Sequence, residues 1–188
     1  MNKAELLYKI RNAESQKVKI AFADIDGILR GKYIHKDKFL KAVDDGLGFC
    51  DVIFGWDCND KCYDNIEITG WQTGFPDARA SIDIDTYREV PWENNNPFFL
   101  GDFSDDPKYA ETTCSRSMLK RIAAESKKMG FLPIFSQEFE WFNFLGTPGE
   151  IHENGFDNLK PITPGMFGYS LLRTSFNHSY FDDLFELL

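Results

Sequence analysis

Hydrophobic and polar residues alternate with the period of a β-strand along several stretches of the first hundred residues. Residues 17–22 alternate lysine or alanine with valine, isoleucine and phenylalanine, which predicts a strand. A second extended run covers residues 28–34, and the Asp26-Gly27 pair between the two runs predicts a hairpin. Further strands are expected over residues 50–56, 81–85 and 97–103.

Apolar residues recur at helical spacing in other parts of the chain. They predict helices over residues 3–15, over 39–43 with Gly46 as terminator, over 118–129 with Gly130 as terminator, and over 180–188. About five strands with one helix between them indicate an α+β fold in which most strands pair antiparallel.

The order of these elements predicts two domains. Residues 59–75 are rich in turn-forming residues and are expected to form a loop. The run Ser104-Asp105-Asp106-Pro107 interrupts the pattern, so we expect one domain over residues 1–106 and the beginning of another over 107–188. The last helical pattern reaches the final residue without a cap, which is typical of a chain cut within a helix.

Composition narrows the classes of partner. The chain has 188 residues, a formal net charge of −9 and 15% aromatic residues, which favours a packed core over disorder. An acidic chain without a basic block is unsuited to the phosphate backbone, so we expect no nucleic-acid partner. No run approaches the ~18 apolar residues of a membrane span. With no recognisable signal peptide, we expect a cytoplasmic protein whose four cysteines are reduced.

The sharpest candidate for chemistry is a pair of glutamates in an aromatic stretch. If residues 135–144 form a strand, Glu138 and Glu140 point to the same face. Two such carboxylates need compensation, and magnesium or manganese prefers carboxylate oxygens. In the alternative interpretation the glutamates lie at the wet end of the strand or pair with arginines. Other carboxylates two residues apart are interpreted as turn or solvated strand positions: Asp24 and Asp26, and Asp83 and Asp85.

A second candidate is Asp57, which follows a predicted strand and faces a loop. A carboxylate at that place can accept hydrogen bonds from a cation such as ammonium, or it can be an ordinary cap or turn residue. Arg30 and Lys32 could meet a phosphate or a substrate carboxylate, or could be surface charges. Cys58 and Cys62 are predicted to be buried thiols and not metal ligands.

Four segments in this order resemble the glutamine synthetase family. Residues 22–32 are similar to the family's opening hairpin, and residues 85–92, with the Pro-Trp pair, to a later strand and turn. The strand at 98–103 also fits, and residues 137–142 resemble the Glu-x-Glu strand that opens the family's catalytic domain. The resemblance implies a β-grasp-like N-terminal domain followed by an incomplete α/β catalytic domain.

The resemblance also implies a reaction. Glutamine synthetases use ATP to phosphorylate the γ-carboxylate of glutamate, and ammonia then displaces phosphate. Glu138 and Glu140 match the family's first two metal-binding glutamates, one for each of two ions, which would be Mg²⁺ or Mn²⁺. Asp57 matches the catalytic aspartate that helps to bind ammonium and to draw a proton from it.

The resemblance covers only part of the machinery. Residues that bind the nucleotide have no counterpart in the chain, and the family's active site lies between neighbouring subunits of a ring-shaped homo-oligomer. We therefore expect the 188-residue chain to lack ligase activity by itself. Three alternatives stay open: a ligase that joins glutamate to another amine, a non-catalytic structural relative, and a metal-dependent hydrolase that uses Glu138 and Glu140.

Overall fold

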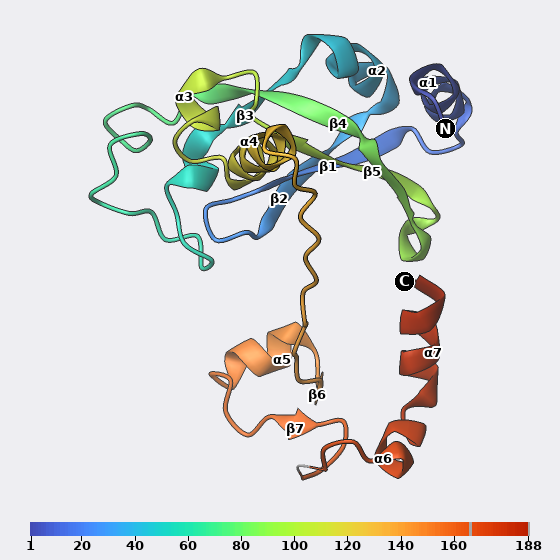
Figure 1. Ribbon diagram of the computed structural model, residues 1–188. Coiled ribbons are helices and arrows are strands. Elements are labelled where there is room, and N and C mark those ends of the chain that lie inside the picture. The colour runs from blue at the N-terminus through green and yellow to red at the C-terminus, as the bar shows by residue number, and fades with distance from the viewer. Residues whose placement is uncertain (166, 188) are drawn as a thin grey trace. The chain divides into compact units, whose positions relative to one another are not determined.

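A computed structural model describes residues 1–165 and 167–187 (Figure 1). The chain divides into two compact units, Met1–Pro133 and Ile134–Leu188. The predicted boundary between residues 106 and 107 is a boundary between expected domains, which need not coincide with these compact units. It stays a prediction. Among the described helices, none is long and apolar enough to cross a lipid bilayer.

A mixed five-stranded sheet forms the centre of the first unit. Its strands are β1 (Lys17–Ala23), β2 (Leu29–His35), β3 (Leu47–Cys50), β4 (Asp77–Val90) and β5 (Asn96–Asp102), in the spatial order β2-β1-β5-β4-β3. The central pair β1 and β5 is parallel, and the other neighbours are antiparallel. The predicted α+β class is therefore confirmed, and the sheet has the β-grasp-like arrangement that the resemblance implies.

The hairpin between β1 and β2 forms where the Asp-Gly signal predicts it. The buried Asp24 accepts hydrogen bonds from the backbone N–H groups of Asp26, at 3.0 Å, and Ile28, at 2.8 Å. Gly27 supplies the left-handed φ of 82° that the turn requires. Asp24 is thus a structural residue, as its sequence context suggests.

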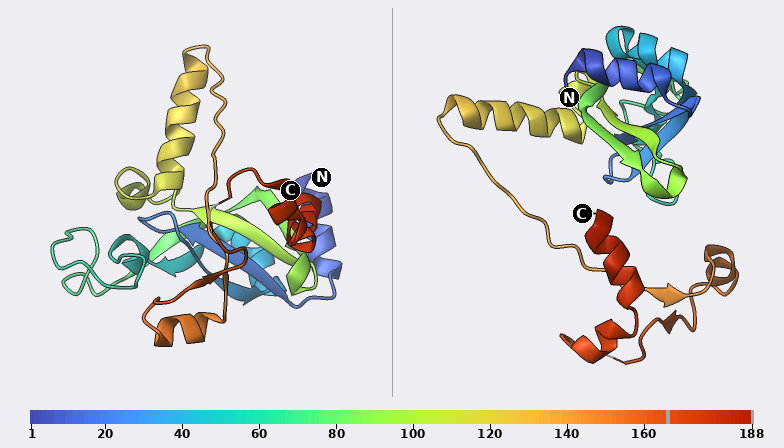
Figure 2. Two further views of the ribbon diagram at one scale, coloured as in Figure 1. Left: turned by 90° about the horizontal axis from the view of Figure 1, so that it is seen from below. Right: turned by 90° about the vertical axis from the view of Figure 1, so that its right-hand side faces the viewer.

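Two helices cover one face of the sheet, α1 (Lys3–Asn12) and α2 (Lys36–Asp45) (Figures 1 and 2). The core lies between the sheet and this layer, and Phe39 of α2 packs on Phe99 of β5 with ring centroids 4.6 Å apart. Gly46 follows α2 with a φ of 71°, which confirms the predicted glycine terminator. Aliphatic side chains and further aromatic rings complete the core, and the rings are Phe22, Phe49, Phe54, Phe103 and Tyr109.

The strand predicted over residues 50–56 is wrong. Strand β3 ends at Cys50, and residues Asp51–Phe54 form the short 3₁₀ helix η1. The reason is the buried carboxylate of Asp51, which hydrogen-bonds Thr69 at 2.6 Å and Tyr109 at 2.7 Å and turns the backbone toward both. The loop predicted over residues 59–75 has no helix or named strand, as expected.

Helix α4 (Ser115–Lys128), which follows the short helices η2 (Pro91–Glu93) and α3 (Pro107–Ala110), contacts the opposite face of the sheet through its N-terminal half. Arg116 and Lys120 of α4 reach Asp83 at 2.6 and 2.8 Å, and Lys120 reaches Asp102 at 2.7 Å. Asp83 is therefore not the simple solvated strand position that its sequence context predicts, because Arg116 and Lys120 of α4 pair with it and leave it partly buried.

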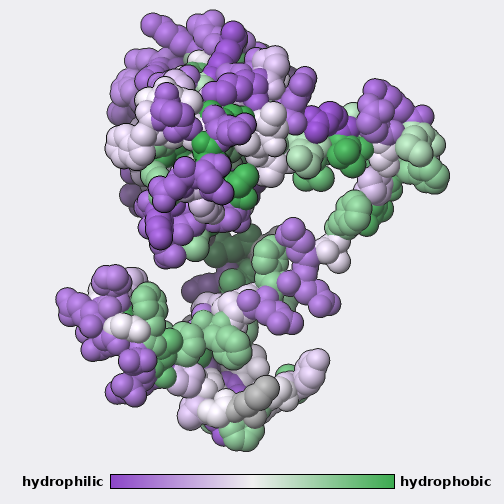
Figure 3. Space-filling model, turned by 90° about the vertical axis from the view of Figure 1, so that its left-hand side faces the viewer, coloured by the Kyte–Doolittle hydropathy of each residue, from purple (hydrophilic) through white to green (hydrophobic). Residues whose placement is uncertain are grey.

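The second unit contains short elements without a core. They are β6 (Phe144–Leu145), α5 (Pro148–Glu153), β7 (Lys160–Pro161), α6 (Leu171–Ser175) and α7 (His178–Leu187). Helix α7 confirms the predicted C-terminal helix up to residue 187, and Leu188 lies outside the described residues. Of residues 134–165 and 167–187, none is buried. Hydrophobic side chains lie at the molecular surface instead, as the green atoms in Figure 3 show.

Candidate functional site

Asp57 lies at the start of a tight turn directly after η1. Its Oδ1 atom accepts hydrogen bonds from the backbone N–H groups of Asn59, at 2.8 Å, and Lys61, at 3.0 Å. The backbone N–H of Asp57 donates to the carbonyl of Lys61, and Trp56 and Cys62 close the turn as a β-bridge. A short loop of this kind holds the carboxylate in one orientation at the surface.

The environment of Asp57 favours its ionised form. The two backbone N–H donors, from Lys61 and then Asn59, hold the pKa of the Asp57 carboxyl below its ordinary value. The charge is therefore present at neutral pH. A carboxylate of low pKa is a good partner for a cation and a weak acceptor of protons.

The side chain of Arg30 connects this turn to the β1–β2 hairpin. Its Nε donates to Oδ2 of Asp24 at 2.8 Å, and its Nη1 to Oδ1 of Asp60 at 2.5 Å. Its Nη2 donates to the backbone carbonyl of Asp57 at 3.3 Å, and the guanidinium lies 4.9 Å from the ring centroid of Trp56. Because each of its three guanidinium nitrogens already has a partner, Arg30 is not free to bind a phosphate. For the same reason it is not an isolated surface charge.

Two other predictions near this turn have different outcomes. The Nζ of Lys32 donates to the carbonyl of Gly48 at 3.0 Å and lies over the ring of Phe49, so Lys32 is also engaged within the fold. All four cysteines are free thiols. The prediction of a buried thiol is wrong for Cys58, which is exposed because it stands at the tip of the Asp57 turn, whereas Cys62 is half-buried.

The strand predicted over residues 135–144 is also wrong, except at Phe144, the first residue of β6. Residues 131–143 have no regular secondary structure, and both Glu138 and Glu140 are exposed. Alternation alone does not make a strand, because a strand needs a hydrogen-bonded neighbour. In the described part of the chain, no strand pairs with this segment.

The two glutamates are the right type of ligand for a hard divalent cation, but two side chains are too few to hold it alone. Carboxylate oxygens are preferred ligands of Mg²⁺ and Mn²⁺. The described residues contain no group of three or more His, Cys, Asp or Glu side chains that could hold a metal ion. Glu138 and Glu140 could therefore supply part of a metal site, and their role as ligands stays a prediction.

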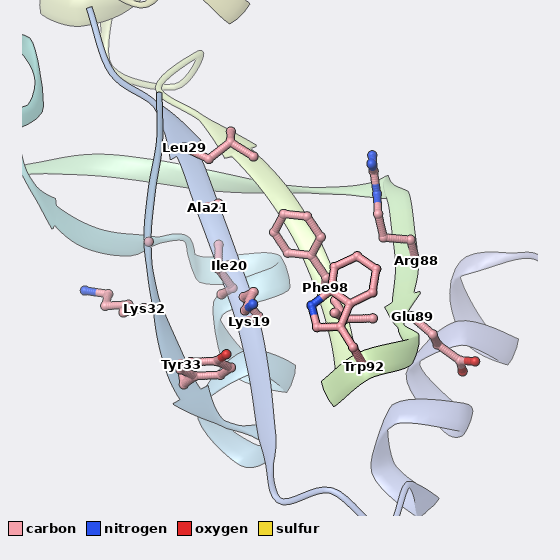
Figure 4. Close-up of a pocket in the computed structure, with 12 residues that line it drawn as sticks. Lys19, Ile20, Ala21, Leu29, Lys32, Tyr33, Arg88, Glu89, Trp92 and Phe98 are labelled. Carbon is pink, nitrogen blue, oxygen red and sulfur yellow. The ribbon is translucent and has the colours of Figure 1, made fainter. Parts of the chain in front are cut away.

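A cavity of about 540 Å³ lies on the face of the sheet away from α1 and α2 (Figure 4). Its lining includes Lys19, Tyr33, Trp92 and Phe98, and Figure 4 shows the Trp92 and Phe98 rings beside each other. Lys19 forms an ion pair with Glu93, so its charge is compensated. The described lining includes Lys32 but not Asp57, Glu138 or Glu140, so this cavity is separate from the predicted catalytic and metal-binding residues.

These features define an α+β protein whose β-grasp-like unit presents an ionised aspartate on an ordered turn. Comparison with known proteins shows that the chain is a homologue of the glutamine synthetases, so the predicted family resemblance is confirmed. It is 46% identical to type-1 glutamine synthetase 2 of Dictyostelium discoideum over 188 residues, which are all of this chain and 36% of that protein. It is 28% identical to a glutamate–isopropylamine ligase of Pseudomonas over 159 residues, 84% of this chain and 35% of that one.

Structural comparison agrees at the level of the fold. The cryo-EM structure of Plasmodium falciparum glutamine synthetase superposes on 69% of this chain and 23% of that chain, with a TM-score of 0.50 and 18% sequence identity. No family model matches the sequence. The chain thus spans about a third of the length of the curated relatives it matches, namely 36% and 35%.

Proposed function

We propose that this chain forms part of an ATP-dependent carbon–nitrogen ligase of the glutamine synthetase type. In this reaction the γ-carboxylate of glutamate attacks the terminal phosphoryl group of ATP and releases ADP. Ammonia then attacks the γ-glutamyl phosphate, phosphate leaves, and the nitrogen loses a proton. The observation that carries the proposal is the 46% identity to a glutamine synthetase over the whole chain.

Within that reaction, Asp57 would bind the nitrogen substrate as a cation. Its carboxylate is partly exposed and is oriented by the two backbone donors, so it is ionised before a substrate arrives. Ammonium or a protonated amine would meet a charge-assisted hydrogen bond at this position. Because the pKa of Asp57 is lowered, the geometry supports binding of the cation more strongly than removal of its proton.

Glu138 and Glu140 would hold divalent cations, Mg²⁺ or Mn²⁺, together with ligands from outside this pair. When bound, such an ion offsets negative charge on the transferring phosphoryl group. The two carboxylates are exposed in an unpaired segment, and they would share one face only if that segment is paired as a strand. Pairing within a homo-oligomer or with more of a catalytic domain would provide that condition.

A second candidate function is a ligase that joins glutamate to a larger amine. The similarity to a glutamate–isopropylamine ligase over 84% of this chain favours it. Both candidates use an amine that is protonated in solution, so both are compatible with an ionised Asp57. They differ in the space around the nitrogen, which a substrate comparison would measure.

A chimeric enzyme tests the proposal directly. Residues 1–188 would replace the homologous part of the Dictyostelium discoideum enzyme, and γ-glutamyl product would be measured with ATP, Mg²⁺ and either ammonium or isopropylamine. We expect activity in the chimera. Asp57→Asn should lower kcat/KM for the amine about tenfold or more, since a hydrogen bond to a charged group is lost.

Matched substitutions show whether the effect is specific. Asp44→Asn removes an exposed carboxylate of α2 that pairs with Lys3 at 2.7 Å, and it should leave the kinetics unchanged. Glu138→Gln and Glu140→Gln should raise the Mg²⁺ concentration needed for half-maximal rate, whereas Glu153→Gln on α5 should not. A well-folded chimera without product, or with Asp57→Asn at full activity, would overturn the proposal for the chain or for Asp57.

A further inference from the structure

We propose that Arg30 is a positioning residue that holds Asp57 and its turn in the orientation needed to bind the amine. The significance of this role rests on the proposed function of Asp57. Arg30 and Asp57 are far apart in the sequence, and Arg30 connects the hairpin to the turn through three donor atoms and a ring face.

The side chain of Arg30 is anchored by the buried carboxylate of Asp24. Asp24 is fully buried at its side chain, and its Oδ1 is engaged by the backbone of the hairpin turn. Its Oδ2 is left for Nε of Arg30, at 2.8 Å. A buried carboxylate requires a partner of this kind, because an uncompensated charge in the interior is strongly unfavourable. The near end of the Arg30 side chain is therefore fixed by the core.

The two terminal nitrogens of the Arg30 guanidinium bind two different parts of the turn. With Nε committed to Asp24, the two terminal nitrogens of the planar guanidinium point outward to different parts of the turn. One meets Asp60 at 2.5 Å and the other meets the carbonyl of Asp57 at 3.3 Å. The face of the group covers Trp56, the residue before Asp57. A lysine ammonium lacks this planar fork and cannot satisfy all four partners at once.

The turn contains a residue in an unfavourable backbone conformation, which contacts outside the turn help to hold. Asp60 adopts a φ of 63°, in the left-handed region that is unfavourable for most residues with a side chain. The far part of the loop has a separate attachment, the hydrogen bond between Thr69 and Asp51. Beyond the hydrogen bonds within the turn, Arg30 links residues 56–60 to the β1–β2 hairpin. The positive charge of Arg30 also adds to the effect of the backbone donors in lowering the pKa of Asp57.

Nuclear magnetic resonance of the full 188-residue chain tests the proposal without requiring ligase activity. Two quantities report on the turn: hydrogen exchange at the amides of Asn59 and Lys61, which donate to Asp57, and the titration midpoint of the Asp57 carboxyl carbon. In Arg30→Gln we expect exchange at both amides to accelerate about tenfold or more, and the Asp57 midpoint to rise.

Three further variants make the result specific. Arg88→Gln removes the same charge at a residue of β4 that has no carboxylate partner within the described chain, and it should change neither quantity. Arg30→Lys should recover most of the global stability but not the protection of the two amides. Asp60→Asn removes only the charge of the outer, exposed contact and should produce a smaller change of the same sign, which keeps the test valid if Arg30→Gln does not fold.

The outcomes separate this inference from the proposed function. Unchanged amide exchange and an unchanged Asp57 midpoint in folded Arg30→Gln would overturn the positioning role, as would full restoration of both by lysine. Neither result bears on whether the chimera makes product. Conversely, an inactive chimera would remove the purpose of the turn but leave the structural coupling of Arg30 to Asp57 measurable.

Discussion

The hydroxyl of Tyr109 donates a 2.7 Å hydrogen bond to the carboxylate of Asp51, and both side chains are buried. Thr69 donates to the other oxygen of the same carboxylate at 2.6 Å. Burial, followed by the neighbouring Asp51, raises the pKa of Tyr109 well above its ordinary value, so its hydroxyl remains a donor. One carboxylate thus ties the 3₁₀ helix η1 to the long loop and to α3.

We predict that Tyr109→Phe lowers the free energy of unfolding by roughly 1–3 kcal/mol, because a buried acceptor loses a partner while the ring remains. Urea unfolding followed by circular dichroism measures the change. Tyr63→Phe is the control, since the side chain of Tyr63 is exposed and its loss of a hydroxyl should have little effect. Equal stabilities of the two variants would show that the Asp51 contact adds nothing.

A second prediction concerns acid stability and the charges beneath α4. Burial opposes ionisation of Asp83 and Asp102. The hydrogen bonds from Lys120, joined by Arg116 at Asp83 and by Ser104 at Asp102, together outweigh it and lower each pKa below the ordinary 3.8. A carboxyl whose pKa is lower in the folded state than in the unfolded state stabilises the fold. This stabilisation is complete above the pKa of the unfolded state and is lost as the pH falls through the pKa of the folded state. The stabilisation should therefore be complete above pH 3.8 and should be lost as the pH falls below 3.8 and through the lower pKa of the folded state.

The variant Asp83→Asn measures this contribution. At pH 7 we expect a loss of roughly 1–3 kcal/mol, since Arg116 and Lys120 each lose a partner. The difference from the unaltered chain should shrink as the pH is lowered from 4 toward 2, in urea titrations at fixed ionic strength. Asp44→Asn, which breaks the exposed pair with Lys3, should cost less than about 1 kcal/mol at any pH. A pH-independent loss in Asp83→Asn would contradict the assignment.

Local patterns predicted the parts of the fold that local chemistry decides. The alternation in β1 and the Asp26-Gly27 turn are properties of neighbouring residues, and both are present in the structure. The helix η1 is different, because Asp51 is turned inward by Thr69 and Tyr109, which lie 18 and 58 residues away. No local pattern contains that information, so residues 50–56 were predicted to be a strand.

The candidate site shows the same division. Asp57 is predicted as a site residue from its place at the end of an apolar run, but its connection to Arg30 depends on a fold that brings together residues 27 positions apart. The sequence signal for this connection is the single arginine of the hairpin, Arg30, in a region rich in aspartates. For Glu138 and Glu140 the alternation was present but the neighbouring strand was not, and pairing is a property of two segments.

A third prediction uses two adjacent phenylalanines of β5. Phe99 is fully buried between Phe39 and Tyr87, with ring centroids 4.6 and 5.4 Å away. Phe98 points to the other face and is only partly buried. Phe99→Ala should cost about 3–5 kcal/mol because it leaves a cavity in the core. Phe98→Ala is the matched control and should cost clearly less in the same urea titration, and the reverse order would contradict the described register.

The fourth prediction concerns the segment at the boundary of the two units. Residues 131–143 have no regular secondary structure, and six chymotrypsin-type side chains in them are exposed: Phe131, Leu132, Phe135, Phe139, Trp141 and Phe142. The phenylalanines of the first unit's core are buried. We therefore expect brief treatment with chymotrypsin to cut within this segment and not within the core of the first unit.

Mass spectrometry of the products locates the first cut. The N-terminal product should retain its circular dichroism spectrum and its cooperative unfolding, because the core lies within Met1–Pro133. The C-terminal product should be degraded further, since none of its described residues is buried and apolar burial is the main source of stability. An N-terminal product that unfolds on cleavage would show that the first unit draws its stability from residues beyond 133, and the division of the chain at that point would then be wrong.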